Sequence, residues 1–136
     1  MTVQILALEK DLFFSVKMRD TLRHHGMEVT IVRSLAAFEQ RLGITGDEKP
    51  VLAIVNTANS GVDWEGAIRR AREHGQPVLA FGSHMDLEAR QKALQAGAQR
   101  VVANSKFAND MPGLVKRMLS EPIVTSTSDE GRVIEE

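Results

Sequence analysis

Short apolar runs alternate with amphipathic segments along most of the chain. The apolar runs have the length of buried strands and occupy residues 3–8, 27–32, 51–55, 78–81 and 100–103. Between them, apolar residues recur three or four positions apart, which predicts helices at 11–25, 35–42, 62–74 and 86–95, and a last helix that starts at Asn109 or Asp110. This alternation predicts an α/β fold with helices on both faces of a parallel sheet. Five strands fit the flavodoxin-like, doubly wound order 2-1-3-4-5.

The composition changes near residue 120. Residues 1–120 carry the whole pattern of strands and helices, and we interpret them as one domain. Residues 121–136 contain few large apolar side chains and several acidic ones. We therefore predict that this segment is a disordered acidic tail.

Charge and composition exclude several classes of function. The 136 residues carry 17 basic and 18 acidic side chains, so no overall field attracts nucleic acid or an anionic membrane surface. No apolar run is long enough to span a membrane. The chain has no cysteine, which fits a reducing compartment, and we expect a cytoplasmic protein. Five Phe, one Trp and no Tyr are too few aromatic residues for a surface that stacks nucleic-acid bases.

The most informative stretch is residues 50–64, PVLAIVNTANSGVDW. Asn56 stands at the carboxyl end of its apolar run, which is the edge where open α/β sheets place their sites. The stretch resembles the phosphoacceptor strand and following loop of response-regulator receiver domains of the chemotaxis-regulator type. Gly61 and Asp63 match that loop, whereas Ser60 and Trp64 depart from it. The resemblance extends from residue 3 to about residue 119.

A working receiver domain holds magnesium with carboxylates after its first strand and with the aspartate that is phosphorylated. It also uses a hydroxyl after strand four and a lysine after strand five. Here the resemblance places Asn56 at the aspartate, Gly82 at the hydroxyl, with Ser83 beside it, and Asn104 at the lysine. Glu9 and Lys10 stand at the two positions of the acidic pair that follows the first strand.

These departures remove the chemistry that the family performs. An amide forms no acyl phosphate, the Lys10 ammonium stands near the metal position, and Gly82 has no hydroxyl. Asn104 also removes the cation that would neutralise a phosphoryl group. The resemblance therefore implies a degenerate pseudo-receiver without enzymatic activity, cofactor or metal. Its vestigial phosphorylation pocket comprises Glu9, Lys10, Asn56, Gly82, Ser83 and Asn104.

Two neighbouring residues leave alternatives open. Trp64 is a lid over the pocket, a contact for a partner, or an aromatic residue packed under its own loop. His84 and Asp86 together suggest a metal or a pH sensor, but no second histidine stands at ligand spacing, and Asp86 is explained as a helix N-cap.

The leading functional hypothesis is an atypical receiver-like protein of two-component signal transduction. It acts by phosphorylation-independent binding of a protein partner or of a second copy, as a homodimer. The family commonly uses the fourth helix, fifth strand and fifth helix for this purpose, which nominates Glu88, Arg90, Gln91, Gln95, Arg100, Lys106, Asn109 and Lys116. The alternative is a sensor that binds a small ligand, with anionic metabolites as first candidates, in the vestigial pocket. An enzyme of another type has no supporting motif.

Overall fold

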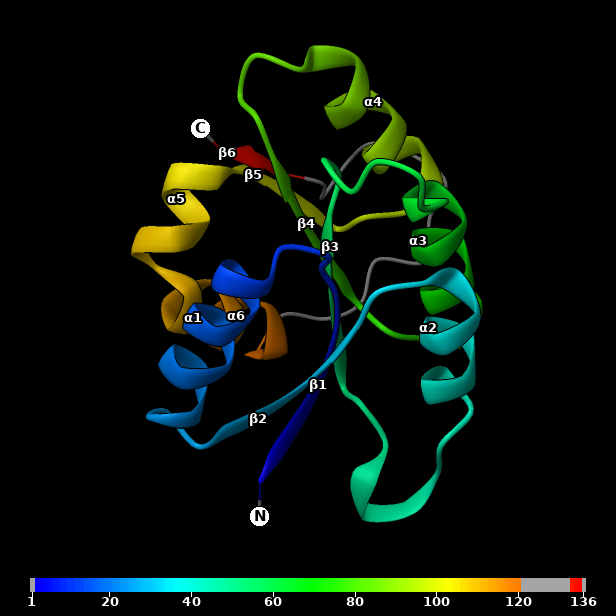
Figure 1. Cartoon of the computed structure of the whole chain (residues 1–136), viewed down its shortest axis with the longest axis vertical. Coiled ribbons are helices and arrows are strands. Elements are labelled where there is room, and N and C mark those ends of the chain that lie inside the picture. The colour runs from blue at the N-terminus through cyan, green and yellow to red at the C-terminus, as the bar shows by residue number, and fades with distance from the viewer. Residues whose placement is uncertain (1, 121–132, 136) are drawn as a thin grey trace.

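The computed structural model describes residues 2–120 and 133–135, and its centre is a parallel sheet (Figure 1). The strand order is β2-β1-β3-β4-β5-β6. The predicted order of the first five strands is therefore confirmed. The strands are β1 Val3–Leu8, β2 Met27–Val32, β3 Leu52–Asn56, β4 Val78–Gly82, β5 Arg100–Ala103 and β6 Val133–Glu135.

Strand β6 was not predicted from the sequence. Its backbone pairs in parallel with β5, with Val133 opposite Arg100 and Glu135 opposite Val102. The prediction of a disordered tail is wrong for these three residues, because a strand can add to any open sheet edge through backbone groups alone. The rest of the predicted tail, residues 121–132 and 136, lies outside the described residues.

Helices cover both faces of the sheet, as predicted. In Figure 1, α1, α5 and α6 lie on one side and α2, α3 and α4 on the other. Side-chain caps begin several of them; for example, Asp11, Ser34 and Asp86 each accept a hydrogen bond from a backbone N–H three residues later. The helices are α1 Leu12–Arg23, α2 Leu35–Leu42, η1 Gly46–Glu48, α3 Trp64–Glu73, α4 Leu87–Ala96, α5 Asn104–Asn109 and α6 Met111–Ser120.

Helix α5 was not predicted from the sequence. The chain passes from β5 directly into this helix at Asn104, whereas the prediction placed no helix before Asn109. Its six residues form less than two turns and bury only Phe107 fully, so no amphipathic period was available. The Phe107 ring stacks on Phe81 with their centroids 4.2 Å apart, and this contact fixes α5 beside the carboxyl end of the sheet.

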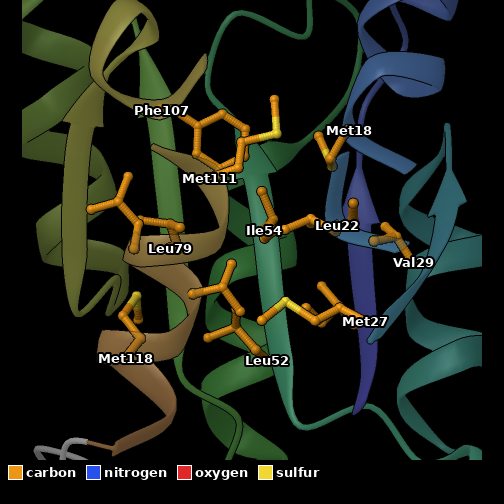
Figure 2. Packing of buried hydrophobic residues seen from close by; sticks show 14 of the residues in the cluster. Met18, Leu22, Met27, Val29, Leu52, Ile54, Leu79, Phe107, Met111 and Met118 are labelled. Carbon is orange, nitrogen blue, oxygen red and sulfur yellow. The ribbon is translucent and has the colours of Figure 1, made fainter. Parts of the chain in front are cut away.

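Two apolar clusters, one on each face of the sheet, hold the layers together. Figure 2 shows the cluster beneath α1, α5 and α6, which is formed by Met18, Leu22, Met27, Val29, Leu52, Ile54, Leu79, Phe107, Met111, Met118 and their neighbours. The second cluster, under α2, α3 and α4, uses the alternate residues of the same strands, such as Ala53 and Val55 of β3. Among the described residues, no helix has the length and apolar character needed to cross a membrane.

Candidate functional site

A pocket of about 470 Å³ opens at the carboxyl ends of the strands, where β1, β3 and β5 run into their loops. It is lined by Glu9, Asp11, Phe14, Asn56, Phe81, Asn104, Ser105 and Ala108. The lining brings together three of the predicted pocket residues: Glu9, Asn56 and Asn104. Lys10, Gly82 and Ser83 are not part of it.

The buried Glu9 carboxylate and the half-buried Asn56 amide form one wall of this pocket. The Asn56 Nδ2 donates to both oxygens of Glu9, at 2.9 and 3.0 Å. Glu9 is only 1% exposed, and its Oε2 also accepts from the backbone N–H of Asp11. The remaining polar atom, Asn56 Oδ1, accepts from the backbone N–H of Ala58 at 2.8 Å. Each polar atom of the two side chains is therefore satisfied within the protein.

Burial governs the ionisation of Glu9. Loss of solvation raises the pKa of its carboxyl above the ordinary value of 4.5, while the hydrogen bonds from Asn56 and Asp11 oppose that rise. The folded protein therefore binds this proton more tightly than the unfolded chain does.

Lys10 points away from the pocket. Its Nζ donates to the backbone oxygen of Ser60 at 2.9 Å, in the loop that follows β3. Its backbone N–H donates to Asn59 Oδ1, and the Asn59 Nδ2 donates to the backbone oxygen of Leu8. Asn59, which is 5% exposed, thus joins the loops after β1 and β3. The sequence analysis did not single it out, because a polar residue in a loop carries no periodic signal.

Gly82, the position of the receiver hydroxyl, lies against Thr57, the residue that follows β3. A Cβ placed on Gly82 would overlap the Oγ1 of Thr57, whose hydroxyl donates to the backbone oxygen of Phe81. Ser83, which could have supplied a substitute hydroxyl, is exposed, and its Oγ accepts from the backbone N–H of Met85 in its own turn.

Solved structures reveal what this architecture resembles. No family model matches the sequence, and no curated protein matches it. A putative response regulator from Chloroflexus aurantiacus is 22% identical, with a TM-score of 0.77 over 89% of this chain and 100% of that one. The receiver domain of the TMAO respiratory system response regulator TorR is 16% identical, with a TM-score of 0.76 over 86% and 96% of the two chains. A response regulator from Thermotoga maritima is 18% identical, with a TM-score of 0.71 over 89% and 100%.

The chain has a receiver-domain fold. The residues that follow β5 and line the pocket are Asn104 and Ser105, and neither is basic. Both are exposed at the first turn of α5.

The sequence left the roles of Trp64 and His84 open. Trp64 is half-buried and packs on the apolar cluster under α3, as expected for an aromatic residue covered by its own loop. His84 is exposed, and its backbone oxygen accepts from Arg90 Nη1. Among the described residues, no group of His, Asp or Glu side chains is arranged to hold a metal ion.

The predicted partner face is only partly available. Arg90 and Arg100 are each 6% exposed, so little of either side chain is accessible to a partner in the described structure. The Lys116 Nζ lies 3.5 Å from His25 Nδ1, on the side of α6 that faces the end of α1. The residues that remain at least partly exposed on α4 and α5 are Glu88, Gln91, Gln95, Lys106 and Asn109.

The raised pKa of Glu9 makes a first prediction. Because the folded state holds this proton more tightly, the free energy of unfolding should fall as the pH rises through the folded-state pKa of Glu9. Glu9→Gln removes that titration. When the pH is raised from about 5 to about 7, the wild type should therefore lose stability relative to the variant. Urea unfolding of both proteins at the two pH values measures the difference. Glu48→Gln, at an exposed carboxylate, serves as the control. Equal pH slopes for Glu9→Gln and the wild type would contradict the assignment.

Proposed function

We propose that the chain is a receiver-like module of signal transduction that binds a protein partner without phosphoryl transfer and without enzymatic activity. The observation that supports this most directly is the Glu9–Asn56 pair. The resemblance assigns Asn56 to the phosphoacceptor and Glu9 to the acidic pair that holds the metal, and here these two side chains hydrogen-bond to each other. The lack of cysteine favours a cytoplasmic setting.

Phosphoryl chemistry would need charges that the described part of the pocket does not supply. A transferred phosphoryl group is strongly negative and is normally stabilised by magnesium and a basic side chain. Here Glu9 and Asp11 line the pocket together with amide, hydroxyl and apolar groups, and the Lys10 ammonium is held by Ser60. An anion entering this pocket would meet two carboxylates with no basic side chain in the lining to offset them, which supports a function other than phosphorylation.

The phosphorylation-independent part of the proposal is tested by amide NMR. Magnesium and then beryllofluoride, an acyl-phosphate mimic, are added to the ¹⁵N-labelled protein. We expect no saturable shifts at Glu9, Asn56 or Gly82. An Asn56→Asp variant is the positive control, because a second carboxylate beside Glu9 should bind magnesium. Saturable shifts in the wild type that spread from these residues into β5 would refute the proposal.

The partner-binding part is tested with a photo-crosslinking amino acid in the native cell. Gln91 of α4 and Gln40 of α2 are both exposed glutamines, and they lie on different helices of the same face of the sheet. We expect position 91 to give a specific crosslink and position 40 to give none. The mass of the product distinguishes another protein from a second copy of this chain. Crosslinks of equal yield at the two positions would argue against a partner on α4.

A ligand sensor is the second candidate, because the pocket volume falls within the range of small-molecule sites. Its two carboxylates favour a cationic ligand over the anionic metabolites considered from the sequence. Benzylamine and benzoate form a matched pair of probes, with similar size and opposite charge. A ligand that binds only the native state raises the midpoint of thermal unfolding. A rise with benzylamine alone would support the sensor, and the absence of a rise with either probe would count against it.

A further inference from the structure

A second hollow, of about 540 Å³, lies at the opposite end of the sheet from the vestigial pocket. Three segments enclose it: the start of β1, the loop that carries η1 and leads into β3, and the turn between α3 and β4. Figure 1 shows the N-terminus and the η1 loop at this same end of the molecule. The volume is typical of a site for a small molecule.

The walls of this hollow are largely apolar. Val3, Pro50, Val51 and Pro77 line it. Val51 is 45% exposed although it immediately precedes the buried strand β3. Apolar side chains that face an open concave surface gain free energy when a ligand covers them.

One buried polar group in the lining lacks a partner. Gln76 is 3% exposed, and its Nε2 donates to the backbone oxygen of Pro50. Its Oε1 is buried and has no hydrogen-bond partner among the described residues. A buried acceptor without a donor is unfavourable, and such groups call for a specific explanation. The terminal torsion of glutamine is soft, so a ligand can be met by rotation of this amide, which moves Oε1 and the Nε2 bonded to Pro50 together.

His74 also lines the hollow. Its Nδ1 lies 2.9 Å from the backbone oxygen of Arg70, and because a carbonyl only accepts, this nitrogen carries the proton. In the neutral ring Nε2 is then an acceptor. Asp47 and Lys49, at the η1 side, are exposed.

We propose that this hollow binds a small, mainly apolar molecule that donates one hydrogen bond, from an N–H or O–H group, to Gln76 Oε1. The apolar walls supply the contact area, and the unpaired amide oxygen selects for the donor. This inference is independent of the proposed signalling function, because it uses no residue of the vestigial pocket or of the α4 and α5 surface.

Indole and indene test the proposal on the full-length ¹⁵N-labelled protein. The two probes have nearly the same shape, but only indole carries an N–H donor. We expect both to shift the amides of Val51 and Gly75, and indole to bind about fivefold more tightly and to move the side-chain amide signals of Gln76. Shifts that do not saturate with either probe, or equal affinities for the two, would overturn the proposal.

Two variants separate the hydrogen bond from general stickiness. Gln76→Met keeps the length of the side chain and removes the acceptor, so indole should lose its advantage over indene while both still bind. Gln99 is the matched control, because its Oε1 is also buried without a partner in the described structure but lies outside the hollow. Gln99→Met should keep the preference for indole. Loss of the preference in both variants would show that Gln76 does not select the ligand.

Discussion

Asn56→Asp is expected to lower the free energy of unfolding by about 3 kcal/mol at pH 7, since a charged hydrogen bond is lost and a like charge is added. The new carboxylate would replace the amide nitrogen that lies 2.9 and 3.0 Å from the oxygens of Glu9. Two carboxylates at this separation, one buried and one half-buried, cannot both ionise without strong repulsion. Chemical denaturation of the variant and the wild type measures the loss.

The same variant should recover its stability in two ways. One proton shared by the pair has a raised folded-state pKa, so the stability of the variant should increase as the pH falls through that value. Magnesium should also stabilise it, because carboxylate oxygens are the preferred ligands of this ion. Asn104→Asp, which adds a charge at an exposed position of the same pocket, should have little effect. Equal stability of Asn56→Asp and the wild type at pH 7 would show that the Glu9–Asn56 pair is unimportant.

Gly82→Ala is expected to destabilise the protein by about 2 kcal/mol, because overpacking a tight interior typically has an effect of this size. Gly82 is buried, and an added Cβ would overlap the Thr57 hydroxyl. Thermal and urea unfolding provide the measurement. Gly43→Ala is a suitable control, since its Cβ would make only an ordinary contact of 3.6 Å with the Gln40 backbone oxygen.

A second substitution identifies the origin of the Gly82→Ala effect. Thr57→Ala removes the hydroxyl, so Gly82→Ala should be much less damaging when Thr57 is already alanine. The coupling free energy from the double-mutant cycle should account for most of the loss. If Gly82→Ala is equally harmful in both backgrounds, another contact must limit this position.

The sheet was predictable because its signal is local. Each of the first five strands is a short, mainly apolar run bounded by polar or turn residues, and five such strands alternating with helices fit the flavodoxin-like strand order. Helix α5 and strand β6 were missed for a physical reason. The former is too short to show a period, and the latter exists only by pairing with β5, which is far away in the sequence.

The candidate site was harder to predict than the fold. The positions of Glu9, Asn56 and Asn104 at strand ends indicated that they lie together, and the structure places all three in one lining. The direction of Lys10 could not be derived, because a long flexible side chain takes its partner from tertiary structure, here the Ser60 carbonyl. Burial of Arg90 and Arg100 likewise depends on packing between elements rather than on the pattern along one helix or strand.

The Thr57 hydroxyl beside Gly82 also restricts the evolutionary paths open to this protein. While Thr57 is present, a serine or threonine at position 82 would have to displace the Thr57 hydroxyl, and we expect that step to be destabilising. The accessible path changes position 57 first, a substitution that by itself brings no hydroxyl to position 82. Whether position 82 tolerates a side chain therefore depends on the residue at position 57, so the effect of a substitution at either site depends on the order in which the two are made.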